Sequence, residues 1–202
     1  MRRLVSSTFL SLDGVMQAPG GPEEDAAGGF PYGGWSVPLW DDEISAFMDE
    51  FMGVPFDLVL GRRTYDIFAG FWPDAPEEAG SKPLNDATKY VASRGRPALP
   101  WADSVLLEGD VVEAVRALKQ QDGPQLQVHG SGELLQTLLR HGLVDQIRVI
   151  VYPVVLGTGK RLFTEGVAPA TLTLTTGRVT PNGTFLGAYE PTGPVRTGTF
   201  ED

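Results

Sequence analysis

Residues 126–142, LQVHGSGELLQTLLRHG, contain the pattern that decides the fold. A short apolar run at 126–130 has the length and composition of a buried strand. The chain then passes through Gly-Ser-Gly into a helical segment, 131–142, which closes at Gly142, a residue typical of the position after a helix. A strand that leads directly into a helix is the repeating unit of an α/β sheet.

The same alternation recurs along the chain. Strands are predicted at 3–12, 57–61, 88–93, 103–109 and 143–157, and helices at 41–52, 62–72 and 110–121. Two last strands, 170–179 and 183–191, flank a turn and form a hairpin. We therefore predict one α/β domain, residues 1–191, with a mostly parallel mixed sheet, helices on both faces and a C-terminal antiparallel hairpin. Residues 13–38 and 73–83 are predicted loops, and 192–202 a disordered tail.

The composition limits what the side chains can do unaided. The 202 residues include no cysteine and two histidines, so disulfides, thiolate chemistry and a multi-histidine metal site are not expected. A net charge of −10 argues against nucleic-acid binding, which needs a basic face. No apolar run approaches the roughly 20 residues that span a bilayer, and no signal peptide is evident, so we expect a cytoplasmic protein without a membrane partner.

Two predicted strand ends carry basic residues in this acidic chain. Ligands of such sheets bind beyond the carboxyl ends of the strands, where free N–H groups of a helix start also suit an anion. The groups found there are Gly61, Arg62, Arg63 and Thr64 after one strand, and Ser93, Arg94 and Arg96 after the next. The alternative is that Thr64 caps a helix and the arginines are simply solvated.

The Gly-Ser-Gly corner adds backbone to the same edge. Gly130 and Gly132 would let a ligand approach the main chain, and Ser131 can cap the helix. A lone G-x-G without a third glycine does not meet the dinucleotide fingerprint, and Glu133 suits the helix dipole. Taken together, the three corners favour a ligand with several phosphate groups, and NADPH fits. Such a cofactor carries the hydride that this chain's side chains cannot supply.

Several segments resemble the dihydrofolate reductase-like superfamily, and within it the branch with the C-terminal reductase domain of the riboflavin-pathway RibD protein. The resemblance covers about residues 3–190. The segments that carry it are TFLSLDGVM (8–16), GGW (33–35), LGRRTYDIFAGFW (60–72), VASR (91–94), VHGSGELLQTLLRHGLVDQI (128–147) and YPVVLGTGKRLF (152–163). The resemblance implies an eight-stranded sheet, a small-molecule substrate and a homodimer.

The resemblance also assigns positions around the cofactor. It implies that phosphates are held at Gly61, Arg62, Arg63 and Thr64, and the 2′-phosphate near Ser93 and Arg94. It places the pyrophosphate against Gly130, Ser131 and Gly132, with Glu133 and Leu134 continuing into the helix. It places the nicotinamide near Thr8, Phe9 and Met16, and a loop bordering cofactor and substrate at Gly157, Thr158, Gly159 and Lys160.

The catalytic positions depart from the family pattern. Dihydrofolate reductases carry one acid on the first helix, and Glu43 or Asp41 are the candidates here, although helix-start acids also favour the dipole. RibD reductases have an acid before the glycine corner, where this chain has His129, a candidate acid, polar wall or core histidine. We predict an NADPH-dependent reductase acting on a C=N or C=O of a heterocycle or a ribosylaminopyrimidine-like compound. The alternative is an NADP(H)-binding module without turnover.

Overall fold

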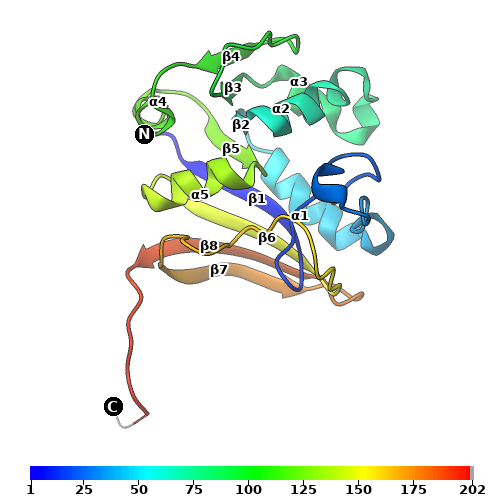
Figure 1. Ribbon diagram of the computed structural model, residues 1–202, viewed down its shortest axis with the longest axis vertical. Helices are drawn as coiled ribbons and strands as arrows, with labels where there is room; N and C mark the ends of the chain where they lie inside the picture. Colours follow the sequence, from blue (N-terminus) through cyan, green and yellow to red (C-terminus); the bar gives the residue numbers. More distant parts are fainter. Residues whose placement is uncertain (201–202) are drawn as a thin grey trace.

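The computed structural model describes residues 1–200, and its centre is one eight-stranded sheet (Figure 1). The strands follow the order β4-β3-β2-β5-β1-β6-β8-β7. The pairs from β4 to β6 are parallel, and β8 lies antiparallel to both β6 and β7. The strands are β1 (Leu4–Ser11), β2 (Phe56–Gly61), β3 (Lys89–Ala92), β4 (Ser104–Leu107), β5 (Gln125–His129), β6 (Gln146–Tyr152), β7 (Thr171–Val179) and β8 (Phe185–Gly193). The predicted mixed sheet and its closing hairpin are confirmed.

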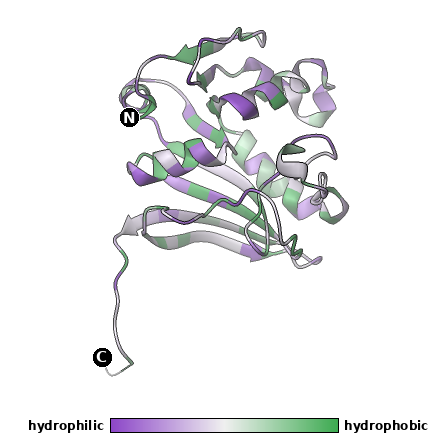
Figure 2. Cartoon of the chain, in the orientation of Figure 1, coloured by the Kyte–Doolittle hydropathy of each residue, from purple (hydrophilic) through white to green (hydrophobic). Residues whose placement is uncertain are grey.

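Helices cover both faces of the sheet, as predicted. They are α1 (Asp42–Met52), α2 (Arg62–Ala69), α3 (Ser81–Asp86), α4 (Val111–Gln120) and α5 (Gly132–Arg140). Helices α4 and α5 form one core with β1, β5 and β6, whereas α1, α2 and α3 belong to two clusters on the opposite face. In Figure 2, α5 alternates between hydrophilic and hydrophobic bands, as expected of a helix with one buried side.

The alternation of side chains along β5 decides what faces the site. Leu126 and Val128 belong to the core beneath α4 and α5. Because successive residues of a strand point to opposite faces, Gln127 and His129 point to the side of α1 and α2. The Gln127 amide accordingly donates to the Phe51 carbonyl of α1 at 2.7 Å.

Several segments differ from the prediction. The strand predicted at 143–157 is confined to β6, and the helix predicted at 62–72 ends at Ala69 in α2. Helix α3 lies in and beyond the predicted loop 73–83, where a six-residue helix containing Pro83 leaves little periodicity to recognise. The long loop 13–38 includes η1 (Ala27–Gly29), leads into η2 (Val37–Leu39) and packs Trp35 into the core. Strand β8 continues to Gly193, so Thr192 and Gly193 of the predicted tail belong to the strand, and Gly193 pairs with Thr171. The chain after β8 extends away from the sheet in Figure 1, and residues 201–202 of that tail lie outside the described residues.

No helix in the described part of the chain is both long and apolar enough to cross a membrane.

Candidate functional site

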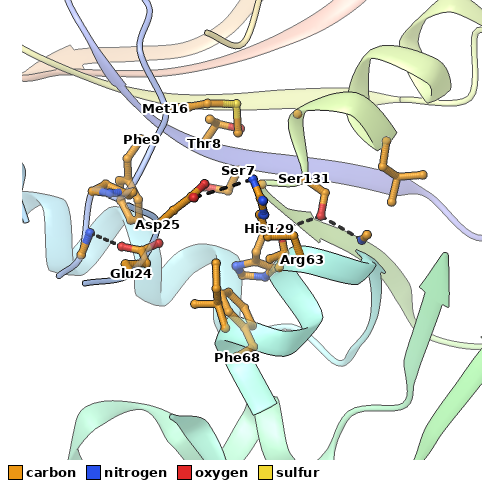
Figure 3. Close-up of a pocket in the computed structure, with 18 of the residues that line it drawn as sticks. Ser7, Thr8, Phe9, Met16, Glu24, Asp25, Arg63, Phe68, His129 and Ser131 are labelled. Carbon is orange, nitrogen blue, oxygen red and sulfur yellow. Dashed lines mark hydrogen bonds and ion pairs between the residues drawn. The ribbon is translucent and has the colours of Figure 1, made fainter. Parts of the chain in front are cut away.

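One cleft of about 3160 Å³ runs along the carboxyl ends of β2, β3 and β5. This volume exceeds the roughly 300–1,000 Å³ of an ordinary small-ligand pocket. The cleft therefore has room for a dinucleotide and a second molecule. It is bounded by the middle of β1, by α1 and by the starts of α2 and α5, and part of it is drawn in Figure 3.

Most of the predicted cofactor positions line this cleft. They are Thr8, Phe9, Met16, Gly61, Arg62, Arg63, Thr64, Ser93, Arg94, Gly130, Ser131, Gly132, Glu133, Leu134 and Lys160. Residues far apart in the sequence thus meet at one sheet edge. Gly157 lies outside the cleft lining, and its N–H donates to the Asp13 carboxylate at 2.9 Å. Asp13 also accepts from Ser11 and Arg161, and these hydrogen bonds, led by the one from Ser11, lower the pKa of Asp13.

Ser131 links the first and third corners. Its Oγ accepts a hydrogen bond from the Gly61 N–H at 2.8 Å and donates to Thr64 Oγ1 at 2.6 Å. The expectation that the Ser131 side chain caps its own helix is wrong, because its hydroxyl bonds to Gly61 and Thr64 instead of to N–H groups of α5. The Ser131 backbone has a left-handed φ of 65°. The starts of α2 and α5 are therefore held side by side.

The helices that meet at Ser131 lack caps. Helices α1 and α4 begin with Asp41 and Asp110, whose carboxylates accept from N–H groups of the first turn. Within the described residues no side chain does this for α2 or α5, whose N-cap residues are Gly61 and Ser131. An uncapped helix start presents free N–H donors and a partial positive charge. Two such starts at one cleft make a site suited to a polyphosphate.

Gly61 is required by this junction. A Cβ at position 61 would lie 2.8 Å from Ser131 Oγ and 2.9 Å from Ser131 Cβ. Its φ of −71° suits any residue, so the constraint is steric contact alone. The sequence analysis assigned Gly61 to the cofactor site. The structure shows that a glycine at this position also leaves space for the Ser131 side chain.

Gly61→Ala is therefore expected to destabilise the protein by about 1–3 kcal/mol through overpacking. Adding Ser131→Gly removes the clash, so the double variant should be more stable than the two single changes predict together. Urea unfolding of the wild type, both single variants and the double variant measures this coupling. Additive effects would contradict the proposed contact.

The arginines of the first two corners already have acidic neighbours. Arg62 Nε lies 2.7 Å from the Asp66 carboxylate, an ion pair within α2 that raises the pKa of Arg62. Arg94 lies 3.5 Å from Glu133, and both side chains are more than 90% exposed. Exposed ion pairs of this kind contribute about 0–1 kcal/mol to stability. A phosphate could therefore replace the carboxylate as the partner of either arginine at small cost in free energy.

Strand β1 and the turn after it contribute apolar side chains and a buried hydroxyl to the cleft. Phe9 packs edge-on against Trp40, with ring centroids 5.9 Å apart. Thr8 Oγ1 is buried and has no hydrogen-bond partner among the described residues. Met16 reaches the glycine corner, since a Cβ on Gly132 would lie 3.1 Å from its Sδ. This arrangement suits a flat ring that carries one polar substituent.

The predicted catalytic acids on α1 do not line the cleft. Asp41 is the N-cap and accepts from Ile44 N–H at 2.9 Å, while Glu43 lies 3.6 Å from Arg178 of β7. The side of α1 that lines the cleft consists of Ser45, Met48, Asp49 and Met52, at the spacing of three and four residues that defines one helical face. Asp41 and Glu43 lie off this face of the helix, and no signal in the sequence indicated which face the sheet would leave open.

His129 lines the cleft in a neutral state. Burial lowers its pKa to about 4, so at neutral pH it carries no proton to donate as an imidazolium. Its Nε2 lies 2.9 Å from Gln127 Oε1, the amide oxygen left free when Gln127 donates to Phe51. Nε2 is therefore the protonated nitrogen, and Nδ1 is a hydrogen-bond acceptor. The general-acid role considered for His129 is not supported.

This depressed pKa predicts a stability change with pH. The unfolded state, with an ordinary pKa near 6.5, binds the proton first as the pH falls. The contribution of His129 to the free energy of unfolding is therefore fully present above about pH 6.5. It is lost as the pH falls towards 4, and the total loss is about 3 kcal/mol. Urea unfolding at pH 7 and pH 4.5 should show a larger loss for the wild type than for His129→Phe. Equal losses would show that His129 titrates normally.

Two acids of the long loop were missed from the sequence. Glu24 accepts from Gly20 N–H at 2.6 Å and from Gly21 N–H at 3.2 Å, and burial raises its pKa. Asp25 is paired with Lys160 and lies 3.7 Å from Arg63, and the Lys160 contact helps to lower its pKa despite burial. Figure 3 shows both carboxylates at the cleft. The only sequence signal was an acidic triplet, 23–25, within a Gly- and Pro-rich loop.

A family comparison now agrees with this geometry. The family model described as "RibD C-terminal domain" matches residues 2–186. The chain belongs to the RibD C-terminal domain family. It is 26% identical over 169 residues to the uncharacterized protein YyaP of Bacillus subtilis, covering 81% of each chain.

Solved structures place this RibD C-terminal domain protein in the dihydrofolate reductase-like fold. It matches a pyrimidine reductase-like protein of Corynebacterium diphtheriae with a TM-score of 0.59 at 14% identity, covering 95% of this chain and 92% of the other. It matches dihydrofolate reductase of Enterococcus faecalis, solved with NADP(H), with a TM-score of 0.60 at 14% identity, covering 94% and 96%. These likenesses confirm the predicted fold.

Proposed function

We propose that this protein is an NADPH-dependent oxidoreductase that reduces a C=N or C=O bond of a small heterocyclic or ribosylaminopyrimidine-like substrate. The observation that carries the proposal is the pair of uncapped helix starts, α2 and α5, joined by Ser131 at one cleft. They would hold the pyrophosphate, with Arg62 and Arg94 available for the 2′-phosphate. Bound NADPH supplies the hydride.

The remaining residues of the cleft would orient and protonate the substrate. Thr8, Phe9 and Met16 would form the wall against the nicotinamide. Since Asp41 and Glu43 lie elsewhere, the proton would come from solvent or from Glu24, whose raised pKa keeps it protonated to higher pH. Asp25, tied to Lys160, would remain ionised beside it.

NADPH is expected to stabilise the protein against heat more than NADH does. At 100 times the dissociation constant a ligand adds about 2.7 kcal/mol, or about 5–10 °C for a domain of this size. Thermal-shift measurements with NADPH, NADH and NADP⁺ test this. No shift with millimolar NADPH would refute the proposal.

Two observations favour a second candidate, an NADP(H)-binding module without turnover. Neither predicted acid of α1 lines the cleft, and His129 is neutral at neutral pH. Absorbance at 340 nm distinguishes the two candidates, with NADPH offered alongside pterins, ribosylaminopyrimidines and quinones in turn. NADPH oxidation with any of them supports the reductase, and tight NADPH binding without oxidation supports the module.

We also propose a homodimer, as the family resemblance implies. The edge strand β7 is largely exposed and presents Leu174 and Val179. Light scattering coupled to size exclusion would give twice the 21.8 kDa chain mass for a dimer.

A further inference from the structure

The long loop 13–38 is fastened firmly on one side of the cleft. The Met16 N–H of this loop donates to the Lys160 carbonyl, in the segment after β6, at 2.8 Å. Phe30 and Trp35 of the loop are buried in the core beside α1. This side of the loop is therefore held by backbone hydrogen bonding and by core packing, which a ligand in the cleft does not disturb.

Gln17 fixes the position of Asp25 within this loop. Its buried side chain donates from Nε2 to the carbonyls of Asp25 and Ala27, both at 2.9 Å, and its Oε1 accepts from the Lys160 N–H at 3.0 Å. The Asp25 carboxylate accepts from the Ala27 N–H at 3.2 Å and pairs with the Lys160 ammonium. Both amide donors of Gln17 thus serve to hold one carboxylate beside one cation.

The contact of Asp25 with the other side of the cleft is weak by comparison. Arg63 of α2 lies 3.7 Å from the Asp25 carboxylate, and Figure 3 shows the two side chains pointing toward each other. The Arg63 side chain is 62% exposed, whereas that of Asp25 is 13% exposed. An ion pair with so exposed a partner contributes about 0–1 kcal/mol. The pair, here called the Asp25–Arg63 latch, therefore opens at small cost.

A ligand phosphate and Asp25 would compete for Arg63. This arginine lies in the first turn of α2, whose start has no side-chain cap and is joined to Ser131 of α5. Asp25, Arg63 and Ser131 line the same cleft. Carboxylates and phosphates both accept from the planar N–H fork of a guanidinium, which cannot direct the same donors at both. Burial opposes ionisation of Asp25, but its hydrogen bond from Lys160 helps to lower the pKa overall, so the competitor is charged at neutral pH.

We propose that Asp25 is an autoinhibitory anion, which pairs with Arg63 across the cleft and must release it before a ligand phosphate can bind there. This regulation of the site rests on the proposed function only in naming NADPH as the ligand. Asp25 keeps its pair with Lys160, so the long loop stays in place while the Asp25–Arg63 latch opens. The latch therefore favours ligands whose phosphates bind strongly enough to displace a carboxylate.

Asp25→Asn is expected to raise the affinity for phosphate ligands about three- to tenfold. Asparagine keeps an oxygen that can accept from the Ala27 N–H, so the charge is removed while the loop turn is retained. Isothermal titration measures the affinities of the wild type and the variant for NADPH and for inorganic pyrophosphate, which carries no nucleotide. If Asp25→Asn does not fold, Asp25→Ser replaces it, since a serine oxygen can also accept from that N–H.

The pyrophosphate affinities decide the proposal. An unchanged or lower affinity in Asp25→Asn, or no pyrophosphate binding by this variant at millimolar concentration, would overturn it. If NADPH binds neither protein, the proposed function fails, and the pyrophosphate ratio still tests the latch. Asp86→Asn is the matched control, because Asp86 pairs with Lys82 on α3 and neither residue lines the cleft. An equal gain from this control would show a general charge effect and refute the latch.

The Arg63→Gln background separates competition for Arg63 from simple repulsion by Asp25. In this background the gain from Asp25→Asn should fall by at least half, because no guanidinium remains to be released. A gain of the same size in both backgrounds would show that Asp25 acts only as a nearby negative charge, and the latch would be refuted.

Discussion

Gly132→Asp is expected to weaken NADPH binding at least about 100-fold while leaving the fold intact. Gly132 is the first residue of α5, whose first turn lines the cleft and has no side-chain cap. A carboxylate there would occupy the anion site and repel a pyrophosphate, and like charges forced together cost several kcal/mol. The same carboxylate suits a helix start, so the melting temperature should hold or rise slightly. Isothermal titration with NADPH and a melting curve measure both effects.

Gly132→Ala is the matched control for this experiment. Its Cβ would lie 3.1 Å from Met16 Sδ, the end of a flexible side chain that can move aside. NADPH affinity should fall only a few-fold. If the aspartate and alanine variants bind NADPH equally, the start of α5 is not where the phosphates bind.

Arg62→Ala combined with Arg94→Ala is expected to weaken NADPH binding far more than NADH binding. Hydrogen bonds between an arginine and a phosphate contribute about 1.5–3 kcal/mol, so each lost contact corresponds to about 10- to 150-fold. NADH lacks the 2′-phosphate and should lose about threefold or less. Titration of both nucleotides into the wild type and the double variant gives the ratio.

Arg116→Ala provides the control for this loss of positive charge. Arg116 pairs with Glu113 on α4 and does not line the cleft. It should leave both affinities unchanged. Equal losses of NADPH and NADH in the Arg62 and Arg94 variant would refute the assignment of the 2′-phosphate to these corners.

Several properties could be read from local sequence alone. The apolar strands, the helix that begins after Gly-Ser-Gly and the closing hairpin all follow from short-range periodicity and turn residues, and the structure confirms them. Because the parallel strands end at one sheet edge, the sequence also predicted that the corners after β2, β3 and β5 would meet. They line one cleft.

The roles of individual side chains required the tertiary structure. Ser131 looked like a helix cap, yet its hydroxyl bonds to Gly61 and Thr64 of another corner. His129 looked like a possible acid, yet the orientation of Gln127 and burial make it a neutral acceptor. Glu24 had no recognisable pattern around it, and its environment comes from the way the long loop folds back.

The physical reason is the range of the interactions. Secondary structure and sheet edges follow from the backbone and from residues within a few positions of one another, which the sequence displays directly. A pKa, a tautomer or a choice of helix face depends on contacts with residues many positions away. The sequence therefore determined the fold and the sheet edge at which the cleft lies, whereas only the packed structure decided that Asp49 rather than Glu43 borders the cleft.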